Sequence, residues 1–444
     1  MKRYFLLIFI LLFIGVFIFN FNVIAEESLN LKEVVRLGLK NNTEIQNSEL
    51  DYLNSENDYE IARRELYPEI SLESSYTRRE EGPMDFESNS ETGFPVITEG
   101  PKDNYNTSLN ISQPLYAGGR IRSGIDLAEN RRELTGVQHQ QQNNEIIYQI
   151  IQNYYQVLMA QDRVEIEKEA LELVKEHKRL ARSSLKAGTA IKSDVLQAEI
   201  EESQAEQRLL EAENQFKMTR KRLGNQVGLD SDFQLKTPEV VPEIGLDFNY
   251  LWQKAVNNRP EIELLDLNQE IARVNLELEQ KSHYPGIFLN GNYSAQGSEF
   301  EPEEGNWSIT ISGKITLYEG GKSGKEQDKI KNKLEQLQKE KNNLKNMVEM
   351  EIEQKIMEVE ENENNIEIQN LNLRKAEENL ELEEKRFQTG TGRSVDVLNA
   401  QNTFNQTRIS RSQAQFTYEQ SLYELLLKTG ELSEYIKEVI TVEN

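Results

Sequence analysis

The sequence predicts an α+β protein built as an internal tandem repeat, and two observations support this prediction. Long proline-free stretches carry apolar residues at helical spacing, and two pairs of shorter stretches alternate apolar and polar residues as β-strands do. Both kinds of stretch occur twice in the same order. We therefore interpret the chain as two copies of one unit.

A glycine-centred turn aligns the two copies. Segment 186–198 returns as 388–400 at an offset of 202 residues, which matches Asp194 with Asp396. The motif Leu-Tyr-x-Gly-Gly at 115–119 returns with the same offset. Nearer the start of each copy the offset is 217, because Tyr67-Pro68 returns as Tyr284-Pro285. Copy one therefore carries 15 extra residues between these two motifs.

The repeat divides the chain into successive parts. We expect a signal peptide at 1–25, repeat 1 at 26–229, a linker at 230–247, repeat 2 at 248–430 and a C-terminal tail at 431–444. Repeat 1 should hold helices up to residue 64, a β-hairpin at 68–115 and a long helical hairpin at 120–226. Repeat 2 should hold one helix near 248–282, a β-hairpin at 285–317 and a helical hairpin at 323–427. Residues 80–103 are rich in Gly, Pro, Ser and acid, which predicts a long exposed loop.

The first residues indicate export. Lys2 and Arg3 precede an apolar run, and Val23-Ile24-Ala25 offers small or aliphatic residues at a cleavage site, so we expect cleavage after Ala25. The alternative is an uncleaved anchor, because the run approaches the length of a membrane-spanning helix.

Composition narrows the class of protein. Only 37% of the residues are apolar and 29% are charged, which suits long solvated helices. A formal charge of −25 disfavours nucleic acid as a partner. There is no cysteine, so no disulfide or thiolate chemistry is expected.

The strands point to a membrane. The clearest one places Trp307, Ile309, Ile311, Ile315 and Leu317 on one face. A length of about ten residues with one apolar face matches a membrane-spanning β-barrel. The alternative is a pair of hairpins covering a soluble core, but no candidate core is evident. Because four strands cannot close a barrel and open edges are not tolerated in lipid, several chains must contribute.

Each copy carries, in the same order, a helix, Tyr-Pro, a strand pair, Leu-Tyr-x-Gly-Gly, a long helix, a Gly-Thr turn and Asp-Val-Leu. This duplicated series of motifs resembles the TolC-type outer-membrane efflux proteins over nearly the whole mature chain. The resemblance implies a homotrimer in the outer membrane, with a 12-stranded β-barrel (four strands per chain) that continues into a 12-helix α-barrel in the periplasm. It also implies a gated exit duct of a tripartite efflux or type I secretion system. This duct would passively conduct substrates from an inner-membrane pump of the RND, ABC or MFS type to the exterior, and a periplasmic adaptor protein would connect the two. No cofactor is implied.

The turns carry the candidate gate residues. The acids Asp194 and Asp396 recur where the helices reverse, either as an acidic constriction that selects cations or simply as helix caps. By the resemblance, Asp396 matches an aspartate ring and Asp194 a lock acid. Phe387 matches the lock's aromatic residue without the usual hydroxyl, and Asn399 replaces a second ring aspartate. The lock's arginine position is Gly392, with Arg393 one place later. The turn tips Gly188, Thr189, Gly390 and Thr391 would dock the adaptor.

No enzyme is predicted. The histidines at 139, 177 and 283 do not form a metal-ligand pattern, and each is interpreted as solvated or structural. Segment 319–326 only superficially resembles a phosphate-binding loop, because its spacing is wrong, and it is interpreted as a strand-to-helix turn. The main alternative to a channel is a secreted or anchored coiled-coil scaffold without a pore, which would leave the amphipathic strands unexplained.

Overall fold

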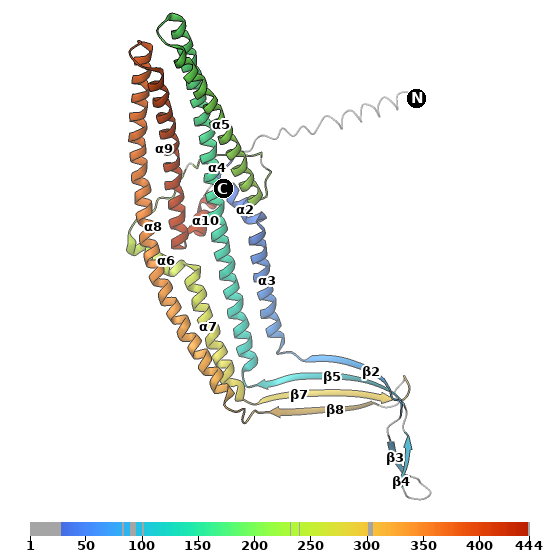
Figure 1. Cartoon of the computed structure of the whole chain (residues 1–444). Helices are drawn as coiled ribbons and strands as arrows, with labels where there is room; N and C mark the ends of the chain where they lie inside the picture. Colours follow the sequence, from blue (N-terminus) through green and yellow to red (C-terminus); the bar gives the residue numbers. More distant parts are fainter. Residues whose placement is uncertain are drawn as a thin grey trace, which may run out of the picture. The chain divides into compact units, whose positions relative to one another are not determined.

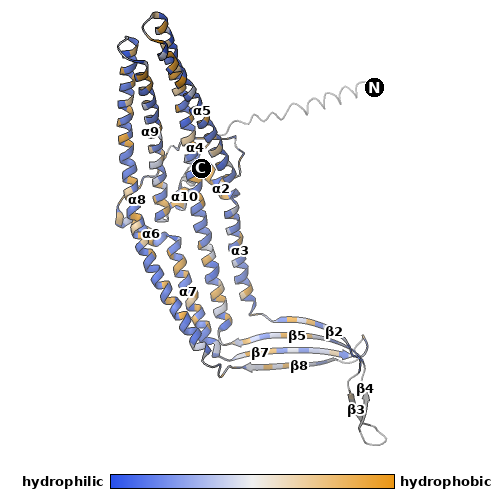
Figure 2. Cartoon of the chain, in the orientation of Figure 1, coloured by the Kyte–Doolittle hydropathy of each residue, from blue (hydrophilic) through white to orange (hydrophobic). Residues whose placement is uncertain are grey.

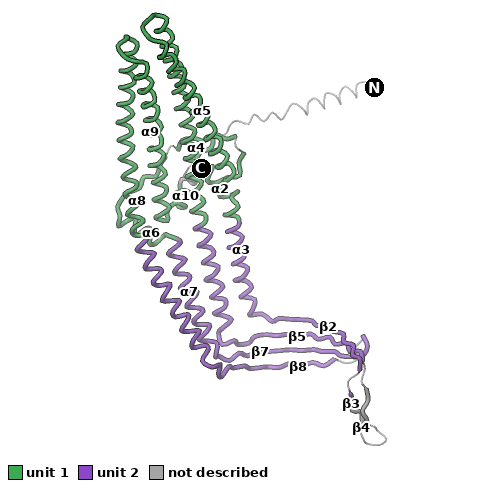
Figure 3. The backbone as a smooth tube through the Cα atoms, in the orientation of Figure 1, with its two compact units in different colours: residues 1–46, 142–259, 348–444 green, residues 47–141, 260–347 purple. Residues whose placement is uncertain are grey.

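The structure is a computed structural model that describes residues 28–81, 84–88, 95–99, 102–230, 232–238, 240–300 and 305–442. The expected signal peptide at 1–25 lies outside them. The chain forms two compact units (Figure 3). Unit 1 comprises the described residues up to Gln46, Gln142–Arg259 and those from Val348 onward, and unit 2 comprises Asn47–Gln141 and Pro260–Met347. Each unit draws on both copies of the repeat.

Two long helical hairpins lie in the segments where the sequence places them (Figure 1). They consist of α4 (Arg120–Ala187) with α5 (Lys192–Val227), and α8 (Lys322–Gln388) with α9 (Ser394–Thr429). Within the described residues, no helix is both long enough and apolar enough to cross a membrane.

Each copy begins with a helix that is interrupted once. In copy one the interruption separates α2 (Leu31–Asn41) from α3 (Thr43–Arg64). The single helix expected near 248–282 is wrong, because the structure has α6 (Phe248–Asn258), α7 (Pro260–Gln280) and the 3-10 helix η1 (Lys281–His283). The break falls at Arg259 because the next residue, Pro260, has no N–H to continue the helix.

The duplication is visible in matching contacts of unit 1. Gly228 ends α5 against Asn41, and a methyl group at Gly228 would lie 2.9 Å from the Asn41 side chain. Gly430 ends α9 against Asn258 in the same way, with the Asn258 carbonyl oxygen 2.7 Å from such a methyl group. Any side chain at either position would clash with the asparagine, so both contacts favour glycine.

Unit 1 has a continuous apolar core. Val34 of α2, Ile150 and Tyr154 of α4 and Leu223 of α5 are fully buried in it. The predicted C-terminal tail contributes as well, because it contains α10 (Leu432–Val442), whose Leu432 is fully buried in the same core. The linker holds β6 (Gln234–Leu235), which pairs in parallel with β1 (Ser28–Leu29).

Unit 2 contains a four-stranded antiparallel sheet. Its order is β2-β5-β7-β8, made of β2 (Glu69–Arg78), β5 (Asp103–Ala117), β7 (Gly286–Gly297) and β8 (Gly305–Lys314). The two predicted hairpins therefore join side by side through β5 and β7. Among the described strands, β2 and β8 each have a neighbour on one side only.

Two details of the strand prediction are wrong. The last strand ends at Lys314 and does not include Ile315 or Leu317, because its partner β7 begins opposite Lys314, at Gly286. Part of the expected loop at 80–103 forms a separate two-stranded sheet of β3 (Met84–Ser88) and β4 (Pro95–Glu99). Apolar residues such as Phe86 and Ile97, which are paired across the two strands, favour strand structure despite the polar surroundings.

Candidate functional site

The turns that join the long helices have the same backbone geometry. In each, the N–H of the threonine reaches back five residues to a carbonyl oxygen, over 2.9 Å at both Thr189 and Thr391. The preceding glycines, Gly188 and Gly390, have φ of 78° and 74°. This is the Schellman arrangement, whose left-handed residue is almost always glycine because it has no Cβ. The duplicated Gly-Thr pair therefore ends each long helix.

The two acids that follow the turns lie at equivalent places but have different partners. The carboxylate of Asp194 accepts a hydrogen bond from the Ile191 N–H at 3.0 Å. The carboxylate of Asp396 accepts two from the Arg393 guanidinium, from Nε at 3.1 Å and Nη2 at 2.8 Å. The bonds from Arg393 hold the pKa of Asp396 below its usual value. Both acids therefore act within their own helix starts, and the charge of Asp396 is locally compensated.

The glycine at the position of the lock's arginine has a local cause. A methyl group at Gly392 would lie 2.9 Å from Arg386 Cβ and 3.0 Å from the Phe387 nitrogen. This turn therefore has no room for a side chain there. Arg393, one place later, is paired with Asp396 of its own helix. Asn399, one turn further along α9, is exposed.

The aromatic residue of the predicted lock is buried. Phe387 packs with Ala181, Val195 and Val397, which brings together all four long helices. Its ring centroid lies 5.0 Å from that of His177. The position of Phe387 within this cluster makes it a packing residue of the turn region.

His177 joins the two hairpins, whereas the sequence left open whether this histidine is solvated or structural. Its Nε2 lies 2.8 Å from Ser394 Oγ at the start of α9, and both side chains are buried. Burial lowers the pKa of His177 to about 4, while the nearby Asp194 opposes the shift. In the sequence, His177 is a lone histidine within a long helix, so no residue pattern reveals its partner.

Below the turns, α4 and α9 meet through polar side chains. Asn405 Nδ2 donates to Glu167 Oε2 at 3.1 Å, and the Ser412 hydroxyl donates to Asp162. Five of the buried polar residues of α9 are spaced at intervals of four or seven, at Ser394, Gln401, Asn405, Ser412 and Glu419. We call these residues and their α4 partners the polar seam. Water can replace the hydrogen bonds of a polar contact more readily than it can replace apolar packing.

In unit 2, hydrophobic and hydrophilic residues alternate along the strands of the sheet (Figure 2), and the pairing brings hydrophobic residues together on one face. The pairing places Leu72 opposite Leu109, Leu109 opposite Tyr293, and Tyr293 opposite Trp307. Ile309 on β8 is 69% exposed, and the apolar residues of this face on β2 and β5 are exposed too. The predicted alternation therefore yields one apolar surface across all four strands.

The opposite face of the sheet is polar and internally hydrogen-bonded. Asn292 Nδ2 donates to Asn110 Oδ1 at 2.7 Å, and Ser112 Oγ donates to Asn290 Oδ1 at 3.1 Å. Asn290 Nδ2 in turn donates to Ser312 Oγ at 3.2 Å. This polar face of the sheet can therefore be solvated by water. Within the described part of the chain, no cluster of three or more His, Asp or Glu side chains could hold a metal ion.

Comparison with known proteins decides the family. The model of the protein family described as "Outer membrane efflux protein" matches residues 34–229 and 251–431 of this chain. This chain belongs to that family. The protein is therefore located in the outer membrane. Its fold and its family are those of transport channels and not of enzymes.

Individual relatives and solved structures agree with this assignment. The chain is 23% identical over 355 residues to the outer membrane efflux protein BepC of Brucella suis biovar 1, across 77% of both chains. It is 26% identical over 196 residues to the toxin and drug export protein A of Aggregatibacter actinomycetemcomitans, across 43% of both chains. The chain thus spans less than half the length of that curated relative. The CmeC outer membrane channel of Campylobacter jejuni shares the fold, with a TM-score of 0.76 at 16% identity over 92% of this chain and 88% of CmeC.

Proposed function

We propose that three copies of this chain form a duct across the outer membrane, through which substrates delivered by an inner-membrane pump leave the cell. One observation carries this proposal. The four-stranded sheet has an exposed apolar face, and its outer strands β2 and β8 each have one edge with no partner among the described strands. Such a sheet is incomplete as a single chain, because lipid accepts an apolar surface but not open backbone edges.

Closure by identical copies satisfies both requirements. If β8 of one copy pairs with β2 of the next, three sheets give twelve strands in a closed β-barrel. The apolar face then contacts lipid and the polar ladder faces the lumen. The four long helices of each copy would form the periplasmic tube.

The helical turns are the proposed gate. Three copies of the Asp194 and Asp396 turns would converge around one axis, where Asp396 contributes to cation selection. Asn399 would lie nearby without adding charge. The polar seam is the surface along which the two hairpins of one copy would separate, and Phe387, packed at the seam's end with His177, would move with it. The exposed tips at Gly188, Thr189, Gly390 and Thr391 are the proposed docking points for a periplasmic adaptor.

The alternative, a coiled-coil scaffold without a pore, is not favoured because it assigns no role to the apolar sheet face. Purified protein in planar lipid bilayers tests the choice. The duct predicts discrete conductance steps of uniform size. A protein that inserts as a trimer and never conducts, even after Asp194→Ala loosens the turns, would support the scaffold.

A further inference from the structure

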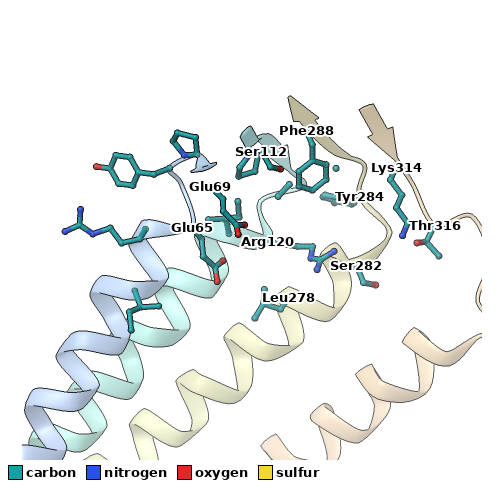
Figure 4. A pocket seen from close by; sticks show the side chains of 18 residues that line it. Glu65, Glu69, Ser112, Arg120, Leu278, Ser282, Tyr284, Phe288, Lys314 and Thr316 are labelled. Carbon is teal, nitrogen blue, oxygen red and sulfur yellow. The ribbon is translucent and has the colours of Figure 1, made fainter. Parts of the chain in front are cut away.

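A cavity of about 930 Å³ lies in unit 2 where the strands meet the helices (Figure 4). Its strand residues, including Glu69, Ser112, Phe288 and Lys314, belong to the polar face of the sheet. If that face lines the duct, as proposed above, the cavity opens into the substrate path. Only the role of this cavity in transport rests on the proposed function; ligand binding in the cavity does not.

Two basic residues of the cavity are Arg120 at the start of α4 and Lys314 at the end of β8. Within one copy, neither side chain has an ion-pair partner among the described residues, so both positive charges are available to an anion. Phe288 is opposite Ser312 in the β7–β8 ladder, so Lys314 is its diagonal neighbour. Diagonal neighbours on one face are about 7–8 Å apart. Lys314 and an aromatic surface therefore lie side by side.

The acidic side of the cavity is formed by Glu65 and Glu69. Within one copy, neither carboxylate has an ion pair among the described residues. The neighbouring Arg64, which also lines the cavity, has its Nη2 atom 3.7 Å from Oε2 of Glu60. Glu69 is on β2 and Lys314 on β8, at opposite sides of the sheet. Three strand spacings separate these strands by about 14 Å.

We infer that this cavity binds dipolar aromatic amphiphiles, which carry an anionic group at one end and a cationic group at the other. Arg120 and Lys314 take the anion, Phe288 and Tyr284 contact the aromatic body, and Glu65 and Glu69 take the cation. Figure 4 shows the labelled glutamates on one side of the cavity and Lys314 on the other, with Arg120 and Phe288 between them. Such a site would hold a substrate briefly at the point where the helices give way to the strands.

Three related probes test the assignment by equilibrium dialysis against the purified, detergent-solubilised full chain. They are biphenyl-4-carboxylate, 4-(aminomethyl)biphenyl, and the biphenyl that carries both groups at opposite ends. The dipolar probe should bind most tightly. Arg120→Gln/Lys314→Gln should weaken binding of the carboxylate about tenfold and leave the amine unchanged, whereas Glu65→Gln/Glu69→Gln should do the reverse.

The crossed design makes each pair of substitutions the control for the other. Equal effects of both pairs on both probes, or no binding of the dipolar probe to the wild-type chain, would overturn the inference. Conductance of the same preparation separates the two proposals. A conducting trimer without binding rejects only the cavity, and crossed binding without conductance rejects only the duct.

Discussion

His177 of α4 and Ser394 of α9 are hydrogen-bonded over 2.8 Å although the two residues are 217 positions apart and belong to different copies of the repeat. His177 is only 4% exposed and Ser394 only 1%. This bond ties the two helical hairpins together just below their turns.

The first prediction concerns pH. Because burial lowers the pKa of His177 from 6.5 to about 4, the folded form favours the neutral ring. As pH falls from 6.5 toward 4 the unfolded state takes up the proton first, so stability should fall by at most about 1.4 kcal/mol per pH unit. As the pH falls from 6.5 to 4, the melting temperature of the wild type should therefore decrease more than that of His177→Gln. Parallel curves for wild type and His177→Gln would contradict the account.

The second prediction concerns the compensated charge of Asp396. In bilayers, a trivalent cation added on the periplasmic side should block the channel, since three carboxylates around an axis attract multivalent cations most. Arg393→Gln should tighten this block several-fold because it frees the carboxylate, and Asp396→Ala should relieve it. If neither substitution changes the blocking concentration in assembled channels, Asp396 is a helix cap only.

The third prediction concerns the faces of the sheet. Ile309 lies on the apolar face and its neighbour Thr310 on the polar face, so adjacent positions serve as a matched pair. Ile309→Arg should cost about 2–4 kcal/mol if it lies near the bilayer midplane, and Thr310→Arg much less. Urea unfolding of the protein in lipid vesicles measures both. Equal costs would mean that the faces are wrongly assigned.

The fourth prediction concerns the glycine at the lock's arginine position. Gly392→Ala should destabilise the turn, because the added methyl group meets the backbone of Phe387. Gly124→Ala is the matched control, since nothing lies within 4 Å of a methyl group there, and it should be neutral or stabilising by up to about 1 kcal/mol. Thermal unfolding followed by circular dichroism should separate the two; similar melting temperatures would show that the turn can yield.

Much of the fold could be predicted because its signals are local and occur twice. The Gly-Thr turns could be predicted because the left-handed backbone conformation at the end of a helix favours glycine. The alternation from Trp307 to Ile311 determines which side chains share a face of the sheet. The sequence could not predict contacts between distant helices, such as His177 with Ser394 or the burial of Phe387. The spacing of three residues between Arg393 and Asp396 is compatible with a local ion pair. This pair was not predicted, because the resemblance places Arg393 beside the arginine position of the lock.

The central claim is that three sheets close through β8 of one copy and β2 of the next. Because the chain has no cysteine, a Ser71→Cys/Ser308→Cys variant would carry one thiol on the polar face of each of these strands. A thiol cross-linker of about 10 Å tolerates an unknown register between the strands. The account predicts a covalent band of three chains on a denaturing gel, absent from either single-cysteine variant. A ladder that continues beyond three chains, or no cross-linking in membrane-inserted protein, would contradict it.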